Sequence, residues 1–172
     1  NNQIGIVTHK LNPKNIKIAQ REALMWGTIQ QDAINFGNIL HEIMAFIHTK
    51  EDVDLAIQKA TELGLITFSQ HQIFKETIAK IVNHEELIPF FDADAKVFNE
   101  QNIIKKAFKN IKPDRVVVKD NMAYLLDYKT GEKHNKHKAQ LEEYELALQE
   151  MKYTVAKKAL IYIGESIEIV TL

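Results

Sequence analysis

The sequence predicts an α/β fold, in which a central mixed sheet is flanked by helices and follows a mainly helical N-terminal half. Apolar residues recur at helical spacing through residues 1–93. Residues 94–172 instead hold short apolar runs separated by turn residues, with one helical segment among them. The length of 172 residues suits a single domain, made of the helical part and an αβ core.

The helical part is expected to contain four helices with a buried face each. Asn15 and Asp52 are candidate N-caps, because their side-chain oxygens accept hydrogen bonds from free backbone N–H groups. Gly64 is a typical helix end. The helices cover about residues 16–25, 29–47, 53–63 and 74–81.

The αβ core is expected to contain five strands and one helix. Residues 116–118 and 123–126 are apolar at successive positions, which is typical of central strands buried on both faces. Residues 133–151 are predicted to form the helix that crosses over to the last strands. The strands lie near residues 95–103, 113–119, 122–129, 158–163 and 167–171.

The two middle strands are predicted to form a hairpin whose open end is charged. Asp120 and Asn121 both tolerate the left-handed backbone of a two-residue turn. Counting back from this turn places Asp114 opposite Asp127, on the same face of the sheet. Lys129 lies two residues further along and points to that face as well.

Two facing carboxylates repel each other, so a fold that keeps them needs compensation. A divalent cation bound between Asp114 and Asp127 would supply it. The competing interpretation is a set of solvated strand ends and surface ion pairs, each contributing about 0–1 kcal/mol. A β-bulge or a longer turn would also separate the two residues.

These residues carry a resemblance to a known family. Pro113-Asp114 followed by Asp127-x-Lys129 resembles the PD-(D/E)xK signature of the restriction-endonuclease-like nucleases. The string Asp127-Tyr128-Lys129-Thr130-Gly131 followed by Gln140-x-x-x-Tyr144 is similar to the RecB-like branch, which includes nuclease domains of exodeoxyribonuclease V and AddAB-type helicase–nucleases. The branch also has an upstream Gly-x-x-x-His helix, matched here by Gly37 and His41.

The resemblance implies a restriction-endonuclease-like core with a metal site. Asp114, Asp127, the carbonyl of Tyr128 and His41 would be the metal ligands. Oxygen ligands favour Mg²⁺ or Mn²⁺, and an imidazole shifts the preference towards Mn²⁺. Glu100 is a candidate second-sphere or second-metal group, with a solvated edge residue as the alternative.

The same resemblance assigns the remaining site residues. Lys129, with Asp114 and Asp127, would be catalytic, and would orient or deprotonate the attacking water or neutralise charge on the phosphate. Gln140 and Tyr144 share a helix face and would lie near the bound strand. Lys133 and Lys136, at the entry of that helix, would contact phosphates of the nucleic acid.

Composition limits the classes of function. The net charge is −1, but residues 101–172 carry 13 basic and 10 acidic side chains, so a positive field would be local to the second half. The chain has no cysteine, which excludes disulfides and a cysteine-held iron–sulfur cluster. No apolar run is long enough to span a membrane and no signal peptide is evident, so we expect no membrane partner and a cytoplasmic location.

The resemblance implies a Mg²⁺- or Mn²⁺-dependent deoxyribonuclease, the exonuclease module of an ATP-dependent helicase–nuclease in recombinational DNA repair. The chain lacks an initial Met, and we expect it to be a fragment of a longer helicase chain. DNA and the helicase motor of the same chain or complex would be its partners. The alternative is a catalytically inactive nucleic-acid-binding or scaffolding module with the same fold.

Overall fold

The computed structural model of the chain describes residues 29–104, 110–164 and 166–172. The chain divides after Asp32, and the compact unit from Ala33 to Leu172 holds both the helices before residue 93 and the sheet after residue 94. The predicted helix over residues 16–25, with its Asn15 cap, lies outside the described residues.

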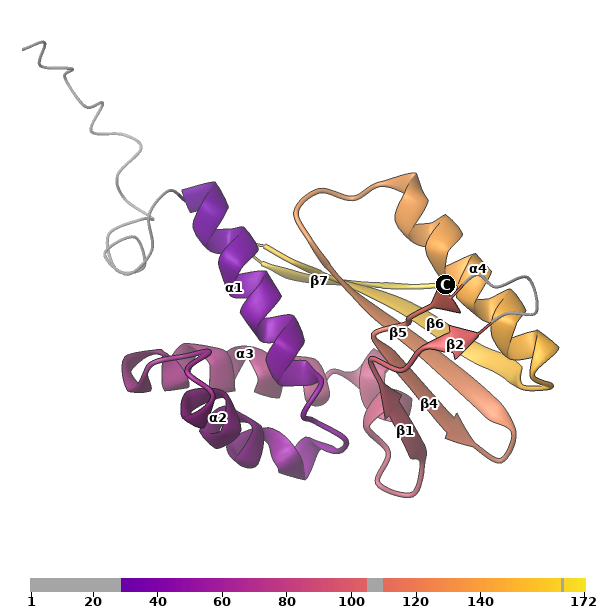
Figure 1. The fold of residues 1–172 in the computed structure, drawn as a ribbon, viewed down its shortest axis with the longest axis horizontal. Coiled ribbons are helices and arrows are strands. Elements are labelled where there is room, and N and C mark those ends of the chain that lie inside the picture. Colours follow the sequence, from indigo (N-terminus) through magenta and orange to yellow (C-terminus); the bar gives the residue numbers. More distant parts are fainter. Residues whose placement is uncertain (1–28, 105–109, 165) are drawn as a thin grey trace, which may run out of the picture. The chain divides into compact units, whose positions relative to one another are not determined.

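A five-stranded mixed sheet forms the centre of this unit, as the sequence predicts (Figure 1). Its strands, in spatial order, are β1 (Lys96–Asn99), β4 (Arg115–Lys119), β5 (Met122–Thr130), β6 (Thr154–Ile163) and β7 (Ile167–Thr171). The β5–β6 pair is parallel and the other pairs are antiparallel. A parallel pair needs a long connection, and α4 (Asn135–Glu150) provides it.

The β4–β5 hairpin has the predicted two-residue turn. Asp120 and Asn121 have φ angles of 49° and 65°, the left-handed backbone that such a turn requires. The register pairs Lys119 with Met122 and Arg115 with Leu126. The next position along each arm therefore brings Asp114 opposite Asp127, and the predicted pairing is confirmed.

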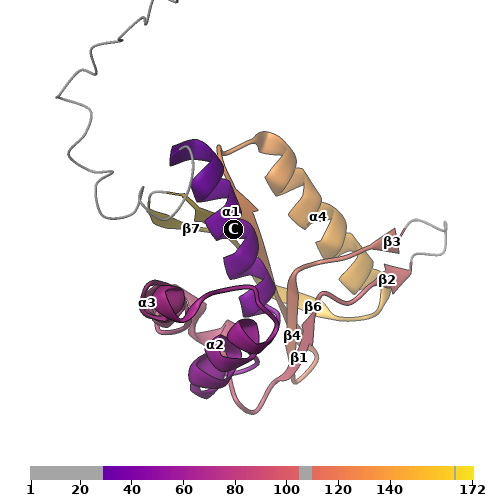
Figure 2. The ribbon, with the colours of Figure 1, turned by 60° about the vertical axis from the view of Figure 1, so that its left-hand side comes forward.

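Helices cover both faces of the sheet (Figure 2). One core joins the sheet to α1 (Ile29–Met44), α2 (Val53–Glu62) and α3 (His71–Val82), and the other joins it to α4. In α1 the buried residues Leu40, Ile43 and Met44, followed by Ile47, repeat at helical spacing. Within the described ranges, no helix is long and apolar enough to cross a bilayer.

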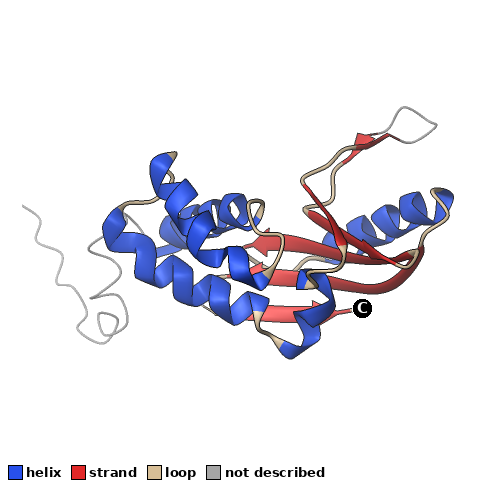
Figure 3. Cartoon of the chain, turned by 90° about the horizontal axis from the view of Figure 1, so that it is seen from below, coloured by secondary structure: helices blue, strands red, loops and turns tan. Residues whose placement is uncertain are grey.

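The first predicted strand is shorter than expected. Residues 95–103 do not form one strand, because Glu100 has a φ of 54° and ends β1 at Asn99. The chain then forms a separate two-stranded sheet from β2 (Ile103–Ile104) and β3 (Asn110–Ile111). This small sheet projects from the main one (Figure 3).

Short 3₁₀ helices, which the apolar pattern does not predict, connect the longer elements. They are η2 (Lys50–Asp52), η3 (Phe68–Gln70) and η4 (Glu85–Phe91). The prediction that the Asp52 side chain caps α2 is wrong. Its carboxylate instead accepts hydrogen bonds from the N–H groups of His48 and Thr49. It thereby closes the capping box of η2.

Arg115 ties the helices to the sheet from inside the core. Its side chain is 1% exposed. The guanidinium donates to the carbonyl oxygens of Ile47 (2.6 Å), His48 (2.5 Å) and Phe90 (2.8 Å). A further N–H donates to Asn99 Oδ1 at 3.0 Å. One side chain of β4 thus supplies hydrogen-bond donors to acceptors in three segments: the residues after α1, the end of η4, and β1.

Replacing Arg115 by Met should lower the free energy of unfolding by about 3 kcal/mol or more, because several buried carbonyls lose their donor. Urea unfolding measures the loss. Lys119→Met is the matched control, since Lys119 forms a partly exposed ion pair with Asp92 and should cost less than about 1 kcal/mol. Equal losses in the two variants would contradict the role given to Arg115.

Candidate metal centre

The hairpin brings the two predicted carboxylates together at the end of the sheet. Asp114 precedes β4, and Asp127 lies in β5 with a side chain only 1% exposed. Asp114 Oδ2 accepts a hydrogen bond of 2.7 Å from the backbone N–H of Tyr128. The backbone of β5 therefore fixes the orientation of the Asp114 carboxylate and leaves its other oxygen for a second partner.

That second partner is His41, which lies in the last turn of α1. His41 Nε2 lies 3.0 Å from Asp114 Oδ1 and 2.8 Å from Glu100 Oε1. Its ring also packs edge-on against Tyr128, with 5.7 Å between ring centroids. The hydrogen bond to Asp114 raises the pKa of His41, and burial partly opposes that shift.

Glu100 enters the site from the break after β1. Its N–H donates to the carbonyl of Asp114 at 2.9 Å, which sets the two residues side by side. The left-handed backbone of Glu100 is uncommon for a residue other than glycine, and such strain concentrates at functional sites. Glu100 also forms an ion pair with Lys112, a residue that the sequence analysis did not single out although it directly precedes Pro113-Asp114.

Gly37 allows α1 to approach the sheet closely. A Cβ at this position would overlap Cγ2 of Thr130, the last residue of β5. The close approach is to a side chain of the strand, one helical turn before His41. A methyl group at residue 37 would therefore push α1 away and move the imidazole with it.

Lys129 lies between Asp127 and α4. Its ammonium forms an ion pair with Asp127 Oδ2 and donates to Gln140 Oε1 at 2.7 Å. Burial and then the charge of Asp114 raise the pKa of Asp127 to about 7, although Lys129 acts in the opposite direction. Burial and the neighbouring carboxylate thus favour the protonated form of Asp127.

These side chains surround one hollow of about 250 Å³. Helix α1, the chain before β4, strand β5 and helix α4 all contribute to its wall. The lining residues that carry chemistry are His41, Lys112, Asp114, Asp127, Lys129, Gln140 and Tyr144. The hollow is polar and open, as a site for a charged substrate would be.

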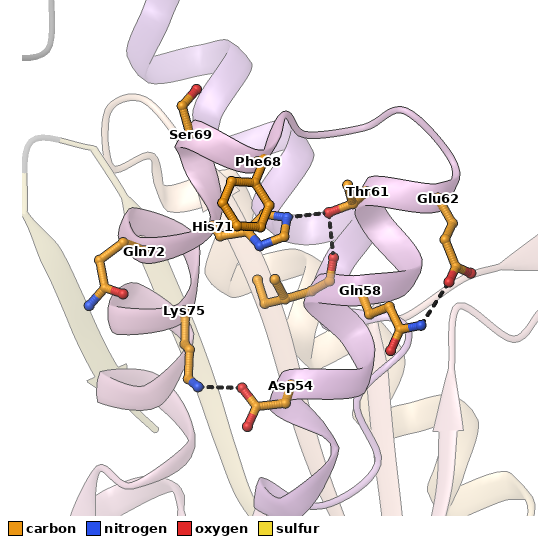
Figure 4. A pocket seen from close by; sticks show the side chains of 10 residues that line it. Asp54, Gln58, Thr61, Glu62, Phe68, Ser69, His71, Gln72 and Lys75 are labelled. Carbon is orange, nitrogen blue, oxygen red and sulfur yellow. Dashed lines mark hydrogen bonds and ion pairs between the residues drawn. The ribbon is translucent and has the colours of Figure 1, made fainter.

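A larger hollow of about 520 Å³ lies between α2 and α3 (Figure 4). Its polar side chains pair with one another: Asp54 with Lys75, and Thr61 with His71. In the part of the chain that the structure describes, the group suited to a metal ion lies elsewhere, at His41. The smaller hollow is therefore the better candidate site.

The residues present fit a divalent cation. His41, Glu100 and Asp114 each offer a ligand atom, and these atoms lie within 4.8 Å of one another. Two buried oxygens, Glu100 Oε1 and Asp127 Oδ2, lie against cationic side chains without a well-formed hydrogen bond. Buried charges need partners, and carboxylates with one imidazole are a donor set that Mn²⁺ or Mg²⁺ accepts.

The residues predicted to contact nucleic acid differ in their positions relative to the hollow. Gln140 lies against Lys129, whereas Tyr144 is buried and bonded on the inner side of α4. Lys133 pairs with Glu168 of β7, and Lys136 does not line the hollow. The basic residues at the start of α4 thus lie outside the cluster, at its approach.

No protein-family model and none of the curated proteins matches the chain. Among solved structures, a chain titled "Crystal structure of SSO0001" is similar at a TM-score of 0.34 and 16% identity. The match covers 80% of this chain and 75% of that chain.

Gly37→Ala should weaken Mn²⁺ binding, measured by isothermal titration, because the new methyl group displaces His41. Adding Thr130→Ser removes the clashing Cγ2 and should restore much of the affinity. Gly164→Ala is the matched control, since a Cβ there meets no atom within 4 Å. Wild-type affinity in Gly37→Ala alone would show that the approach of α1 does not set the site.

Asp127→Asn should change how stability depends on pH in the presence of a chelator. The folded pKa of about 7 exceeds the unfolded value, so the free energy of unfolding falls as pH rises from about 4 to 7. The raised pKa of His41 adds to this fall at higher pH. The amide cannot ionise, so Asp127→Asn should show a shallower slope and exceed the wild type in stability at pH 8.

Thermal and urea unfolding at pH 5 and pH 8 measure the effect. Asp120→Asn, at the hairpin turn, is the control for removal of an exposed carboxylate. Identical slopes for the wild type and Asp127→Asn would contradict the raised pKa.

Proposed function

We propose that the chain is a metal-dependent nuclease with a restriction-endonuclease-like core, of the RecB-like branch. The observation that carries the proposal is the convergence of His41, Asp114, Asp127 and Lys129 on one hollow, from three separate parts of the chain: α1, the residue before β4, and β5. The same residue types occur in the signature that the sequence resembles. Metal-dependent phosphodiester hydrolysis needs carboxylates that hold the metal ion, and a basic or positively charged side chain beside the attacking water.

The metal would be held by His41, Asp114 and Asp127, with the carbonyl of Tyr128. Because the Tyr128 N–H bonds to Asp114, and the N–H and C=O of a strand residue point to the same neighbour, this carbonyl faces the carboxylates. Glu100 joins the ligand candidates, since it contacts His41 directly. When bound, Mg²⁺ or Mn²⁺ supplies Lewis-acid stabilisation of the phosphate and a more acidic water.

The protein residues have separate tasks in this proposal. Lys129, held by Asp127, orients the attacking water, whose proton passes to solvent as the new P–O bond forms. The Lys129 ammonium neutralises charge that grows on the non-bridging phosphate oxygens. The bridging P–O bond then breaks, and the leaving oxygen takes a proton from solvent.

The substrate would be DNA, guided by local positive charge. Lys112 is exposed at the rim of the hollow, and Lys133 and Lys136 lie at the start of α4. A net charge of −1 gives little general attraction, so affinity should fall steeply with salt. We therefore propose the exonuclease module of a cytoplasmic helicase–nuclease, to which the motor of the same chain or complex delivers DNA during recombinational repair.

End-labelled single-stranded DNA should be cut at low salt with Mn²⁺ or Mg²⁺, and not with EDTA. Lys129→Ala should reduce cleavage by about a hundredfold or more, because it removes transition-state charge stabilisation. Lys80→Ala, exposed on α3 and not part of the hollow, is the matched control and should cut normally.

Isothermal titration with Mn²⁺ tests the ligands separately, and Asp114→Ala with Asp127→Ala should abolish binding. Unchanged Mn²⁺ binding in that double variant would overturn the ligand assignment. DNA binding and Mn²⁺ binding without cleavage would favour the alternative, an inactive nucleic-acid-binding module with the same fold.

A further inference from the structure

A line of three hydrogen bonds runs from Lys129 through α4 to the chain that enters β4. Lys129 Nζ donates to Gln140 Oε1 at 2.7 Å. Gln140 Nε2 donates to the hydroxyl oxygen of Tyr144 at 2.6 Å, and that hydroxyl donates to the carbonyl of Lys112 at 3.2 Å. The line joins the residue proposed to act on the phosphate to a fixed backbone atom.

The direction of every bond in this line follows from its far end. The Lys112 carbonyl can only accept, so the single proton of Tyr144 points to it. The phenolic oxygen must then accept from the NH₂ group of Gln140. The carbonyl end of the same amide consequently faces Lys129, where it accepts an N–H. The Lys129 ammonium can only donate and so requires the same orientation, while the Tyr144 hydroxyl holds the NH₂ end of the amide in place.

The line also limits the freedom of Lys129. A lysine side chain has four rotatable bonds, so an untethered ammonium samples many positions. Here Asp127 and Gln140 hold it from two directions, and its side chain is 17% exposed. A third N–H direction remains for a phosphate oxygen or a water in the hollow that Lys129 lines.

Tyr144 lines the hollow but exposes little surface to a nucleic-acid strand. It is 4% exposed and packs in the core between α4 and the sheet. Burial raises the pKa of Tyr144 to about 12, so its hydroxyl keeps its proton at neutral pH. The resemblance implies a place near the bound strand, but the contacts of Tyr144 lead inward, to Gln140 and to the backbone.

We propose that Tyr144 is a positioning residue, which acts through Gln140 to hold the Lys129 ammonium at the place where the phosphate reacts. The effect on the reaction rests on the proposed nuclease function. The tethering of Lys129 rests on the hydrogen-bond geometry alone. Tyr144 binds no substrate, and its contribution is to the rate of the chemical step.

Tyr144→Phe tests the proposal, since it removes only the hydroxyl. In Mn²⁺-dependent cleavage of single-stranded DNA, kcat should fall about tenfold, the effect of losing roughly one hydrogen bond, while KM stays within about twofold. A strand-binding role predicts the opposite, a higher KM at unchanged kcat. Tyr153→Phe is the matched control, because Tyr153 packs against the same core without belonging to this line.

A second readout needs neither metal nor DNA. In the metal-free protein, ¹⁵N NMR of the lysine side chains should show a slowly exchanging ammonium that is lost in Lys129→Arg. Tyr144→Phe and Gln140→Ala should both make its hydrogen exchange several-fold faster, and Tyr153→Phe should not. This experiment reports the tether itself, whatever reaction the site performs.

The two readouts separate the inference from the function on which it rests. Faster exchange without cleavage in any variant would support the positioning role and defeat the nuclease proposal. Unchanged exchange in Tyr144→Phe, or no slowly exchanging Lys129 signal in the wild type, would overturn the positioning role even if DNA is cut. A raised KM at unchanged kcat would overturn it as well.

Discussion

The structure depends most on the buried guanidinium of Arg115. It donates to the backbone carbonyls of Ile47, His48 and Phe90, and Asn99, which accepts from the same guanidinium, is the second donor to Ile47. The three carbonyls lie at the ends of the helical layer, and Arg115 directly follows Asp114 in sequence. The anchor that holds the helices on the sheet and the carboxylate at the centre of the site are therefore neighbours on one strand, so the position of α1 and the geometry of the site are set together.

The site itself is a balance of three acids against three bases. Glu100, Asp114 and Asp127 meet His41, Lys112 and Lys129, and each acid contacts at least one base. These contacts offset part of the repulsion among the carboxylates, although burial and the charge of Asp114 still raise the pKa of Asp127. A cation that enters must displace His41 or Lys112 from the acids, which favours a doubly charged ion over a singly charged one.

Local rules predicted the hairpin well, because turn chemistry and strand alternation act over a few residues. Asp120-Asn121 fixed the register, and the register alone placed Asp114 opposite Asp127. The break at Glu100 was not predictable, since a left-handed backbone at a glutamate is imposed by its surroundings. Lys112 and Arg115 were missed for the same reason: their partners, Glu100 and the carbonyls after α1, lie far away in sequence. The role of His41 as a site residue was predicted from the family pattern. Helical periodicity alone does not distinguish a core histidine from a metal ligand.

The β4–β5 hairpin has a consequence for the way the chain folds. A hairpin forms in about 1–10 μs, whereas the parallel β5–β6 pair must wait for α4 to cross over and His41 must arrive with α1 from much earlier in the chain. Asp114 and Asp127 are therefore brought together with Lys129, which pairs with Asp127, before His41 reaches Asp114. In the hairpin alone, Asp114 would lack its imidazole partner, so this end of the hairpin would gain less from pairing than it does in the native state. The charged end of the hairpin is therefore completed only when α1 packs on the sheet.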